Sequence, residues 1–539
     1  MTMWGNGMMT RTGLCRTAGA LLLAGVAWPA LAQDDRVPAP RAAPMVFAPV
    51  TPRELATGPD SPDMQREVRD LREAIRLTYW GNPTILSQRA TVRSTDNRYP
   101  AARAAYGLTL SAEATHGYQR DRVQTPPAGF VGSQGWSTVA TAILNQPLFT
   151  FGRASGGEKV ALAQIAFARD TLRLNETQTL LGAITAYISV IRDRQAVSIA
   201  RQNLALLDRQ LGDSRERFRV REITSSDLQQ IETRVELGRA QLIQAEGQLG
   251  ATEAQFVQLV GAQPGDLASP DALVIPVASL EQAYDTSDTR SPVIRAAQSR
   301  EKISRATVQA LKAEFGPRID ARGTATYDAV SPYSNNLRTT QLRGEIVLSM
   351  PLLDANLRLS RQREAEQANA ADWRLIDQAV RDAHASIASN WKQMAASRAA
   401  LDNFQLAIDA AQKAYDGAVI QEKAGARTTL DVLDLARDLL NVRNSYNAAL
   451  ANEYIGRANV LAAMGLLEAP ELVPDIDRYD PAIYYDQVDG RGDLPLVTDV
   501  LFGLDRAVSG QVSTDRAIVD PGAQVRVTET RPLPPPRQP

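Results

Sequence analysis

The chain has 539 residues and nearly balanced charge, with 59 Lys and Arg against 61 Asp and Glu. Its length allows several domains of ordinary size. Because the basic residues are spread along the chain, nothing in the composition indicates nucleic acid as a partner. Cys15 is the only cysteine, which excludes a disulfide framework.

The N-terminus has the features of a secretory signal peptide. Arg11 and Arg16 precede an apolar run at residues 18–28, and a small-residue cleavage site ends at Ala32. No later stretch reaches about 18 consecutive apolar residues, the length that a transmembrane helix needs. We therefore predict a signal peptide at residues 1–32 and an exported protein whose helices lie outside the membrane.

The second half of the chain repeats the first. Pro83 recurs as Pro292 at an offset of 209 residues (292 − 83), and Pro147 recurs as Pro351 at an offset of 204 (351 − 147). The difference of five residues (209 − 204) falls between two predicted strands, where a surface loop is expected. An internal duplication restricts the possible architectures strongly. We divide the chain after the signal peptide into a proline-rich disordered segment, two repeats, and a C-terminal belt segment with a flexible tail, at residues 33–62, 63–290, 291–468 and 469–539.

Each repeat contains a long stretch without proline. None occurs at residues 148–263 or 352–469, and Leu181, Ile184 and Ile188 have the three–four spacing of a coiled-coil seam. At about 1.5 Å per residue, a helix of this length would extend roughly 100 Å, which is too deep for an ordinary globular domain. We predict a long helix at residues 153–219, and return helices at residues 225–260 and 429–464.

Shorter helices precede the strands of each repeat. We predict them at residues 83–103 and 292–313, each placed end to end with a return helix, so that the stacked pair matches a long helix at roughly 90 Å. Pro100 predicts a kink in the first of these helices, and its counterpart Gln309 predicts none in the second.

Four segments alternate between apolar and polar residues. The clearest has Ile319, Ala321 and Ala325 on one face, with Asp320 and Arg322 on the other. Such alternation alone also fits a half-buried strand of a soluble sheet. In an exported protein, segments of about ten residues have the length of a tilted membrane strand. We predict strands at about residues 107–119, 136–149, 318–328 and 338–350, joined in pairs by loops at residues 124–135 and 329–338.

Four strands are too few to close a membrane barrel, because the smallest such barrels have about eight. Open edges inside lipid would leave backbone groups without hydrogen-bond partners. Two or more chains must therefore each supply four strands, which gives eight for a dimer or twelve for a trimer. The sequence is compatible with both. The predicted fold class is mainly α with a membrane β-barrel.

The chain resembles the TolC family of outer-membrane channel proteins in Gram-negative efflux and type I secretion systems. The resemblance covers about residues 71–467. It is carried by Asn82-Pro83, by Gln146-Pro147-Leu148-Phe149, by Arg217-Phe218-Arg219-Val220 with Ile223-Thr224-Ser225-Ser226-Asp227, and by Gly425-Ala426-Arg427-Thr428-Thr429-Leu430-Asp431-Val432-Leu433-Asp434.

The resemblance implies a homotrimer in the cell outer membrane that extends into the periplasm. Its twelve strands would form one barrel, continued by a periplasmic α-helical barrel. Such a channel-tunnel is the passive exit duct of a tripartite export system, for protein in type I secretion or for small molecules in efflux. It is opened by a periplasmic membrane-fusion adaptor together with an inner-membrane ABC or RND transporter. The resemblance implies no cofactor.

The resemblance also implies a site at the turns between the long and return helices, which close the periplasmic entrance at rest. By motif match, Asp431 and Asp434 would form a ring at that entrance. Arg427 would take part in the bonds that hold it shut, with Asp227 as a partner from the first copy.

The chain departs from the family pattern at two positions of these turns. Glu422 stands where a tyrosine is common, and Arg221 stands where the first-copy turn is expected to have glycine. A carboxylate at Glu422 would repel Asp227 if the two lay close together. We therefore treat Glu422 and Arg221 as gate or lock candidates, with Arg221 compensating the charge of Glu422.

A structural role competes with gating for two of these acids. Thr224 with Asp227 and Thr428 with Asp431 both have the spacing of a capping box, in which hydroxyl and carboxylate bind free amides at a helix start. Asp227 and Asp431 could serve in capping, in gating or in both, because the two roles are compatible. Asp434 lies one turn further along and has no capping duty. It is therefore the better candidate for an exposed ring, which would favour cations.

The sequence gives little support for an enzyme or a metal site. His116 and His384 are the only histidines, and zinc-protease, nucleophile-elbow and phosphate-loop motifs are missing. We expect His116 to face the barrel lumen. The main rival interpretation is a periplasmic coiled-coil adaptor or scaffold protein without a pore, which does not account for four alternating strands.

Overall fold

The computed structural model describes residues 66–127, 129–331, 338–491, 493 and 497–509. The predicted signal peptide, the proline-rich segment and the tail beyond residue 509 lie outside these ranges. In chain order the elements are β1 (Glu67–Val68), α1 (Leu71–Gly81), α2 (Pro83–Asp96), α3 (Arg98–Arg103), the 3-10 helix η1 (Ala104–Tyr106), β2 (Thr109–Thr125), β3 (Gly129–Phe149), α4 (Arg153–Arg219), α5 (Ser225–Val260), β4 (Gln263–Pro264), α6 (Leu280–Arg290), α7 (Pro292–Ala313), β5 (Arg318–Ser331), β6 (Arg338–Ser349), α8 (Leu357–Lys423), α9 (Thr429–Met464), α10 (Ala469–Leu472), α11 (Ala482–Val488) and α12 (Val497–Ser509).

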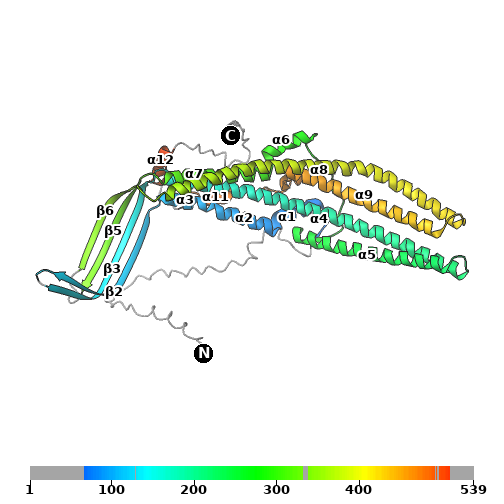
Figure 1. The fold of residues 1–539 in the computed structure, drawn as a ribbon, viewed down its shortest axis with the longest axis horizontal. Helices are drawn as coiled ribbons and strands as arrows, with labels where there is room; N and C mark the ends of the chain where they lie inside the picture. Colours follow the sequence, from blue (N-terminus) through cyan, green and yellow to red (C-terminus); the bar gives the residue numbers. More distant parts are fainter. Residues whose placement is uncertain (1–65, 128, 332–337, 492, 494–496, 510–539) are drawn as a thin grey trace, which may run out of the picture. The chain divides into compact units, whose positions relative to one another are not determined.

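Two helical hairpins of equal dimensions run side by side (Figure 1). The long helices α4 and α8 have 67 residues each, and the return helices α5 and α9 have 36 each. The bounds of α4, α5 and α9 coincide with the predicted ranges because the proline-free stretches carry an uninterrupted helical period. Within the described residues, no helix is both long and apolar enough to cross a membrane.

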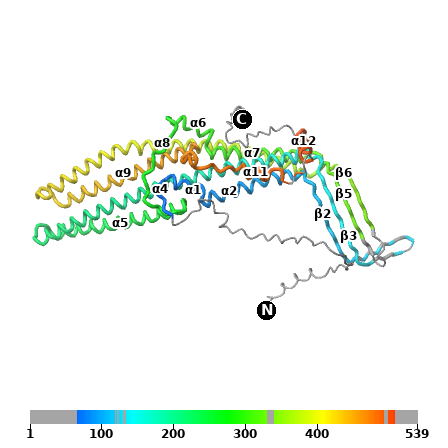
Figure 2. Tube along the Cα trace, turned by 180° about the vertical axis from the view of Figure 1, so that it is seen from behind, coloured from blue at the N-terminus to red at the C-terminus, as the bar shows by residue number. Residues whose placement is uncertain are grey.

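Each return helix is continued by a shorter helix of the same repeat (Figure 2). The Asn82 side chain, at the start of α2, donates a hydrogen bond to the carbonyl of Leu259 at the end of α5, at 2.8 Å. In the second repeat, a Cβ at Gly465 would lie 2.3 Å from the carbonyl oxygen of Arg290, so the end of α9 touches the chain just before α7. The stacked pairs are therefore α5 with α2 and α9 with α7.

The first short helix is broken rather than kinked. We predicted one helix at residues 83–103 with a kink at Pro100, whereas α2 ends at Asp96 and α3 begins at Arg98. Proline has no N–H to donate, and its ring clashes with the carbonyl four residues earlier, which here belongs to Asp96. The interruption therefore falls three residues before the proline, at Asn97.

The largest core lies midway along the helices, where the segments after both return helices pack against them. Tyr187 of α4 is fully buried, and its hydroxyl donates to the carbonyl of Ala268 at 2.7 Å. Arg89 of α2 lies over the ring of Tyr479, 4.7 Å from its centroid, and donates to Glu176 at 3.3 Å. Burial raises the pKa of the Glu176 carboxyl above its ordinary value, and the charge of Arg89 opposes that shift. The segments that follow α5 and α9, the second of which includes part of the predicted belt segment, thus join the helices at their middle.

The four longer strands form one antiparallel sheet in the order β2-β3-β5-β6. Side chains alternate between its two faces. One face carries exposed apolar residues, among them Leu342 at 80%, Ile346 at 74% and Leu348 at 67%. The other face carries charged residues. Within the described residues, β2 and β6 each have a strand partner on one side only, so the sheet is open at both edges.

The hairpin between β2 and β3 is longer than predicted. We expected a loop at residues 124–135, but the ladder continues to the pair Thr125 and Gly129. The polar and glycine-rich composition of this segment suggested irregular structure. Two such strands still satisfy each other's backbone groups when they extend an existing ladder. In the second repeat, β5 and β6 run to Ser331 and from Arg338, and residues 332–337 of the predicted loop lie outside the described part.

His116 lies on the apolar face of the sheet, and our expectation that it faces the lumen is wrong. It pairs with Thr138 in the same alternation as Ala112 and Ala114. Its ring stacks on Trp136 with centroids 5.1 Å apart, and Tyr118 packs edge-on against the same indole at 5.7 Å. Aromatic side chains at one height on an apolar face are typical of the girdle where a membrane strand leaves the hydrocarbon.

A helix that the sequence analysis missed, α12, returns to the junction between the sheet and the long helices. Asp505 of α12 is fully buried and accepts hydrogen bonds from the backbone N–H groups of Thr150, Gly152 and Ser155, at 3.2, 2.8 and 3.3 Å. These groups belong to the start of α4, whose N-cap Gly152 has no capping side chain of its own. The C-terminal region thus supplies the cap of a helix about 350 residues earlier.

Candidate functional site

The two turns between long and return helices have the same backbone geometry. Arg221 and Gly425 are equivalent in the repeat and both adopt left-handed φ, at 64° and 72°. The N–H of Glu222 binds the carbonyl of Arg217 at 2.8 Å, and the N–H of Ala426 makes the matching bond in the second turn at 2.9 Å. Both hairpins therefore end in the same helix-terminating turn, in which glycine is the residue without strain.

Replacing Arg221 by glycine is expected to stabilise the first turn. A non-glycine residue in the left-handed conformation destabilises the folded turn by about 1 kcal/mol or more. Glycine removes this strain, but its greater conformational freedom in the unfolded chain offsets part of the stabilisation. Hydrogen exchange of amides at residues 216–228 should slow by about two- to fivefold. The reciprocal variant Gly425→Arg should accelerate exchange at the second turn. Faster exchange in Arg221→Gly would contradict the inference that Arg221 strains the first turn.

Both predicted capping boxes are present at the starts of the return helices. The N–H of Asp227 donates to the hydroxyl of Thr224 at 3.2 Å, and the N–H of Thr224 donates back to the Asp227 carboxylate at 3.1 Å. Thr428 and Asp431 make the same reciprocal pair at 3.2 and 3.3 Å. The Asp227 carboxylate also accepts a bond from the Thr224 hydroxyl at 2.8 Å. Capping therefore accounts for the position of both aspartates.

Glu422 is the buried acid of this end of the molecule, with 7% of its surface exposed. One of its oxygens, Oε1, accepts hydrogen bonds from Gln210 at 2.8 Å, from Thr429 at 2.7 Å and from Arg217 at 3.3 Å. Gln210 and Arg217 lie one heptad apart on α4, so they face the same side of that helix. Glu422 thus links the second hairpin to the first.

These partners replace the ones that we expected for Glu422. Its carboxylate is held by donors of its own, as is that of Asp227, and the arginine beside it is Arg217 rather than Arg221. Arg217 appeared in the sequence only as part of the family-like segment. Its seven-residue spacing from Gln210 is the one local signal that marks them as a pair.

Asp434 forms a second link between the hairpins. Its carboxylate lies 2.9 Å from an Nη atom of Arg234 on α5 and 3.8 Å from Arg437. The Asp434 side chain is 50% exposed, so it is accessible but already paired. Nearby, Leu433 of α9 packs into an apolar cluster with side chains of α4 and α5, namely Leu207, Leu211, Ile231 and Val235.

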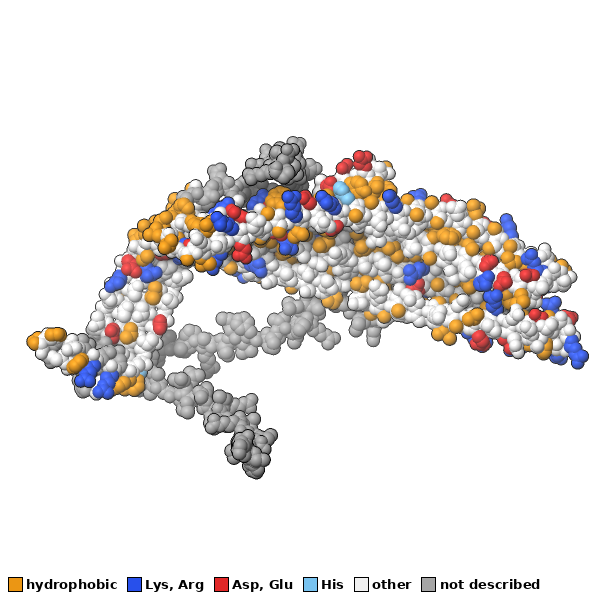
Figure 3. All heavy atoms as spheres, viewed as in Figure 1, with side chains coloured by type: hydrophobic (Ala, Val, Ile, Leu, Met, Phe, Trp, Pro, Cys, Tyr) orange, Lys and Arg blue, Asp and Glu red, His pale blue; other side chains and the backbone are white. Residues whose placement is uncertain are grey.

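Arg427 is exposed, and within the described residues no ion pair includes it. Acidic and basic side chains gather at this end of the hairpins (Figure 3). Of the predicted site residues, the structure thus brings Glu422 and Asp434 into contact with the other hairpin. Asp227 and Asp431 act within their own turns, and Arg221 shapes the first turn through its backbone.

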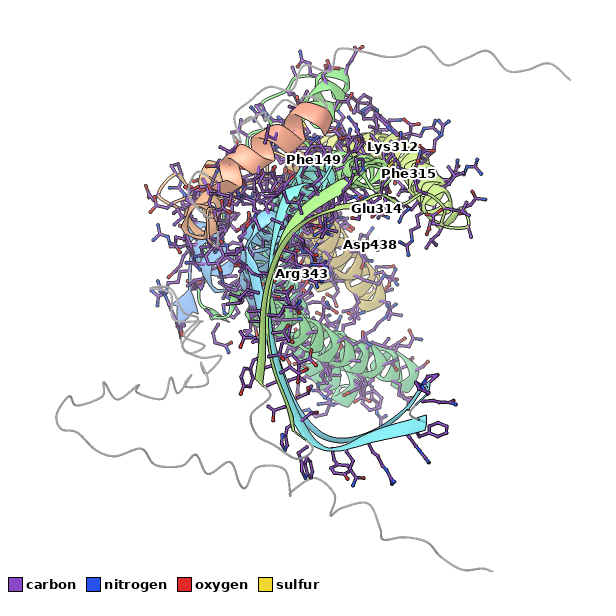
Figure 4. All side chains as sticks on the ribbon, turned by 90° about the vertical axis from the view of Figure 1, so that its left-hand side faces the viewer. Phe149, Lys312, Glu314, Phe315, Arg343 and Asp438 are labelled. Carbon is purple, nitrogen blue, oxygen red and sulfur yellow. The ribbon has the colours of Figure 1, made fainter. Side chains whose placement is uncertain are left out.

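The charged face of the sheet is the other polar surface. Arg318 pairs with Asp320 at 2.8 Å, and Arg322 lies 3.8 Å from Glu345 across β5 and β6. These residues line an open hollow together with Arg343, which is labelled in Figure 4. Within the described residues, no group of acidic, histidine or cysteine side chains is arranged to hold a metal ion.

The sequence and fold match those of known outer-membrane proteins. The family described as outer membrane efflux protein matches residues 75–262 and 283–466, which is one match per repeat. Outer membrane efflux protein BepC of Brucella suis is 29% identical over 429 residues, covering 78% of this chain and 90% of BepC. Alkaline protease secretion protein AprF of Pseudomonas aeruginosa is 23% identical, covering 62% of this chain and 71% of AprF.

Solved structures show the same fold. The outer membrane protein VceC of Vibrio cholerae has a TM-score of 0.62 at 16% identity, covering 73% of this chain and 96% of VceC. This chain therefore has the fold of the TolC-like channel-tunnels, as we predicted from its sequence. The chain belongs to the outer membrane efflux protein family.

Proposed function

We propose that three copies of this chain close one twelve-stranded barrel in the outer membrane and that their hairpins form a tunnel into the periplasm. The observation that carries the proposal is the sheet with two faces and two open edges. Edge backbone groups inside lipid must find partners, and four strands cannot close on themselves. The family is trimeric, which favours twelve strands over the eight of a dimer.

The two faces of the sheet fit this assembly. Exposed apolar residues such as Leu342 and Ile346 would meet lipid. Charged residues such as Arg322 and Glu345 would line a water-filled lumen. In that assembly, β6 of one copy pairs with β2 of the next, since these are the edge strands of the described sheet.

We further propose that the helix turns form the closed entrance of the tunnel. Support comes from the contacts that join the two hairpins there, through Glu422 with Arg217 and through Asp434 with Arg234. Opening requires the hairpins to separate, which would break both links. Asp431 and Asp434 would line that entrance as an acidic ring, as the family resemblance implies. Arg427, exposed in the single chain, is available to a neighbouring copy.

The family works in tripartite systems with a periplasmic adaptor and an inner-membrane pump. We propose a passive exit duct that serves a membrane-fusion adaptor with an ABC or RND transporter. BepC is named for efflux and AprF for protease secretion, so both small molecules and proteins are candidate substrates. The family is one of channels rather than of enzymes.

Purified oligomer in planar lipid bilayers tests the proposal. We expect discrete single-channel conductance and a mass of three chains by native mass spectrometry. A heat-unfolded sample of the same preparation serves as the control. A folded trimer without conductance would support the rival interpretation, a scaffold without a pore. A conducting dimer would overturn only the strand count.

A further inference from the structure

Helix α12 lies across the base of the sheet rather than along the tunnel helices. In Figure 4, which looks along the long helices from the sheet end, α12 is seen lengthwise. It lies on the opposite side of the sheet from Arg343, a residue of the charged face. The helix is therefore on the side of the apolar face, at the level where the strands end.

One side of α12 is fixed to the rest of the chain. Phe502 is 1% exposed and packs edge-on against Tyr106, with ring centroids 4.8 Å apart. Asp505, on the same side, caps α4 through the backbone of Thr150 and Gly152. These buried contacts fix how the helix is rotated about its axis.

A second side of α12 is polar and points toward the tunnel helices. Asp499 accepts a hydrogen bond from Arg103 of α3 at 2.8 Å. Arg506 donates to Glu158, in the second turn of α4, at 2.7 Å. Both partners belong to helices, whereas Thr150, which contacts Asp505, directly follows the end of β3. The polar side therefore faces away from the sheet.

A third side is apolar and exposed. Val497, Val500 and Leu504 are 47%, 60% and 56% exposed, and their spacing of three and four residues places them on one face. At about 100° per residue, this face lies roughly 140° around the helix from Asp499 and Arg506. It therefore faces the sheet end of the molecule, where the membrane begins.

We propose that α12 is an interfacial helix that inserts Val497, Val500 and Leu504 into the periplasmic leaflet of the outer membrane. An amphipathic helix that lies in the plane of a bilayer buries its apolar side at the boundary of headgroups and acyl chains. Three observations favour lipid as the occupant: α12 crosses the tunnel helices, it lies on the side of the sheet's apolar face, and its polar side is already paired with the protein. The proposal rests on the outer-membrane location of the chain.

Fluorophore labelling tests this proposal, because Cys15 is the only native cysteine and lies in the predicted signal peptide. Leu504→Cys and Val500→Cys are labelled with an environment-sensitive nitrobenzoxadiazole dye in vesicles of phosphatidylethanolamine and phosphatidylglycerol. Asp499→Cys is the matched control on the polar side, where Arg103 retains Asp493 and Glu158 as partners. Unsubstituted protein carried through the same labelling reports any signal from Cys15.

Lipid carrying a doxyl quencher near the ester groups should reduce the emission at positions 500 and 504 by about twofold or more, and iodide should have little effect there. Position 499 should show the reverse. Shielding of position 504 from both quenchers would indicate a second copy of the chain as its cover and would overturn the proposal. Quenching by iodide as strong as at position 499 would show that the face meets water, which overturns it equally. Conductance of the labelled oligomer shows separately whether the channel function holds.

Discussion

Asp505→Ala should lower the stability of the folded chain by about 3 kcal/mol or more. The carboxylate is fully buried and accepts three backbone N–H groups at the start of α4, together with the Thr150 hydroxyl at 3.1 Å. Alanine removes the acceptor that these buried donors share. It also removes a negative charge from the positive end of a helix of 67 residues. Thermal unfolding in detergent, followed by circular dichroism, measures the effect.

Asp499→Ala is the matched control for Asp505→Ala, since both acids lie on α12. The Asp499 side chain is 76% exposed, and Arg103 keeps Asp493 at 2.6 Å, so the expected loss is about 0.5 kcal/mol. Asp505→Asn should fall between the two alanine variants, because an amide oxygen still accepts hydrogen bonds but carries no charge. Equal stability of the two alanine variants would contradict the capping role of Asp505.

Glu422→Ala should open the entrance of the resting channel. The change removes the acceptor shared by Gln210, Arg217 and Thr429, and thereby one of the two ion pairs that join the described hairpins near their turns. A hydrogen bond to a charged group contributes about 1.5–3 kcal/mol, which would raise the ratio of open to closed channels by about tenfold or more. Single-channel recording in planar bilayers measures the open fraction directly. Adding Asp434→Asn, which weakens the second link, should raise it further.

Glu232→Gln is the matched control for the entrance. Glu232 of α5 pairs with Arg215 of α4 within the first hairpin, and their side chains are 43% and 60% exposed, so losing this pair should leave the open fraction nearly unchanged. Glu422→Gln should have a smaller effect than Glu422→Ala, because the amide oxygen retains one hydrogen bond. If Glu422→Ala has the same open fraction as the wild type, the link to Arg217 does not hold the entrance shut. This result would not contradict the proposed barrel and tunnel.

Most of the helical architecture follows from local sequence. The bounds of α4, α5 and α9 coincide with the predicted ranges because helical period, absence of proline and capping residues all act within a few positions of one another. The capping boxes at Thr224 and Thr428 are local in the same sense. Alternation likewise located the four strands, although it gave their outer ends too short in the first hairpin, where polar side chains hide a continuing ladder.

Local sequence patterns did not predict the contacts between segments that are distant in the chain. Arg221 was expected to compensate the charge of Glu422, whereas the rotation of α4 presents Gln210 and Arg217 to that carboxylate instead. His116 was expected to face the lumen, but it lies on the apolar face of the sheet. Its even spacing from Ala112 and Ala114 would have placed it correctly.

The repeat, the long hairpins, the alternating strands and the family resemblance can all be read from the sequence, because each depends on residues close together in the chain or on the same spacing used twice. The contacts between the hairpins and the position of α12 become visible only in the folded chain. Asp505 caps α4 across about 350 residues, and no periodicity connects positions so far apart. Such pairings depend on how completed helices pack and rotate against one another, which is settled by the burial of their apolar faces rather than by local preference.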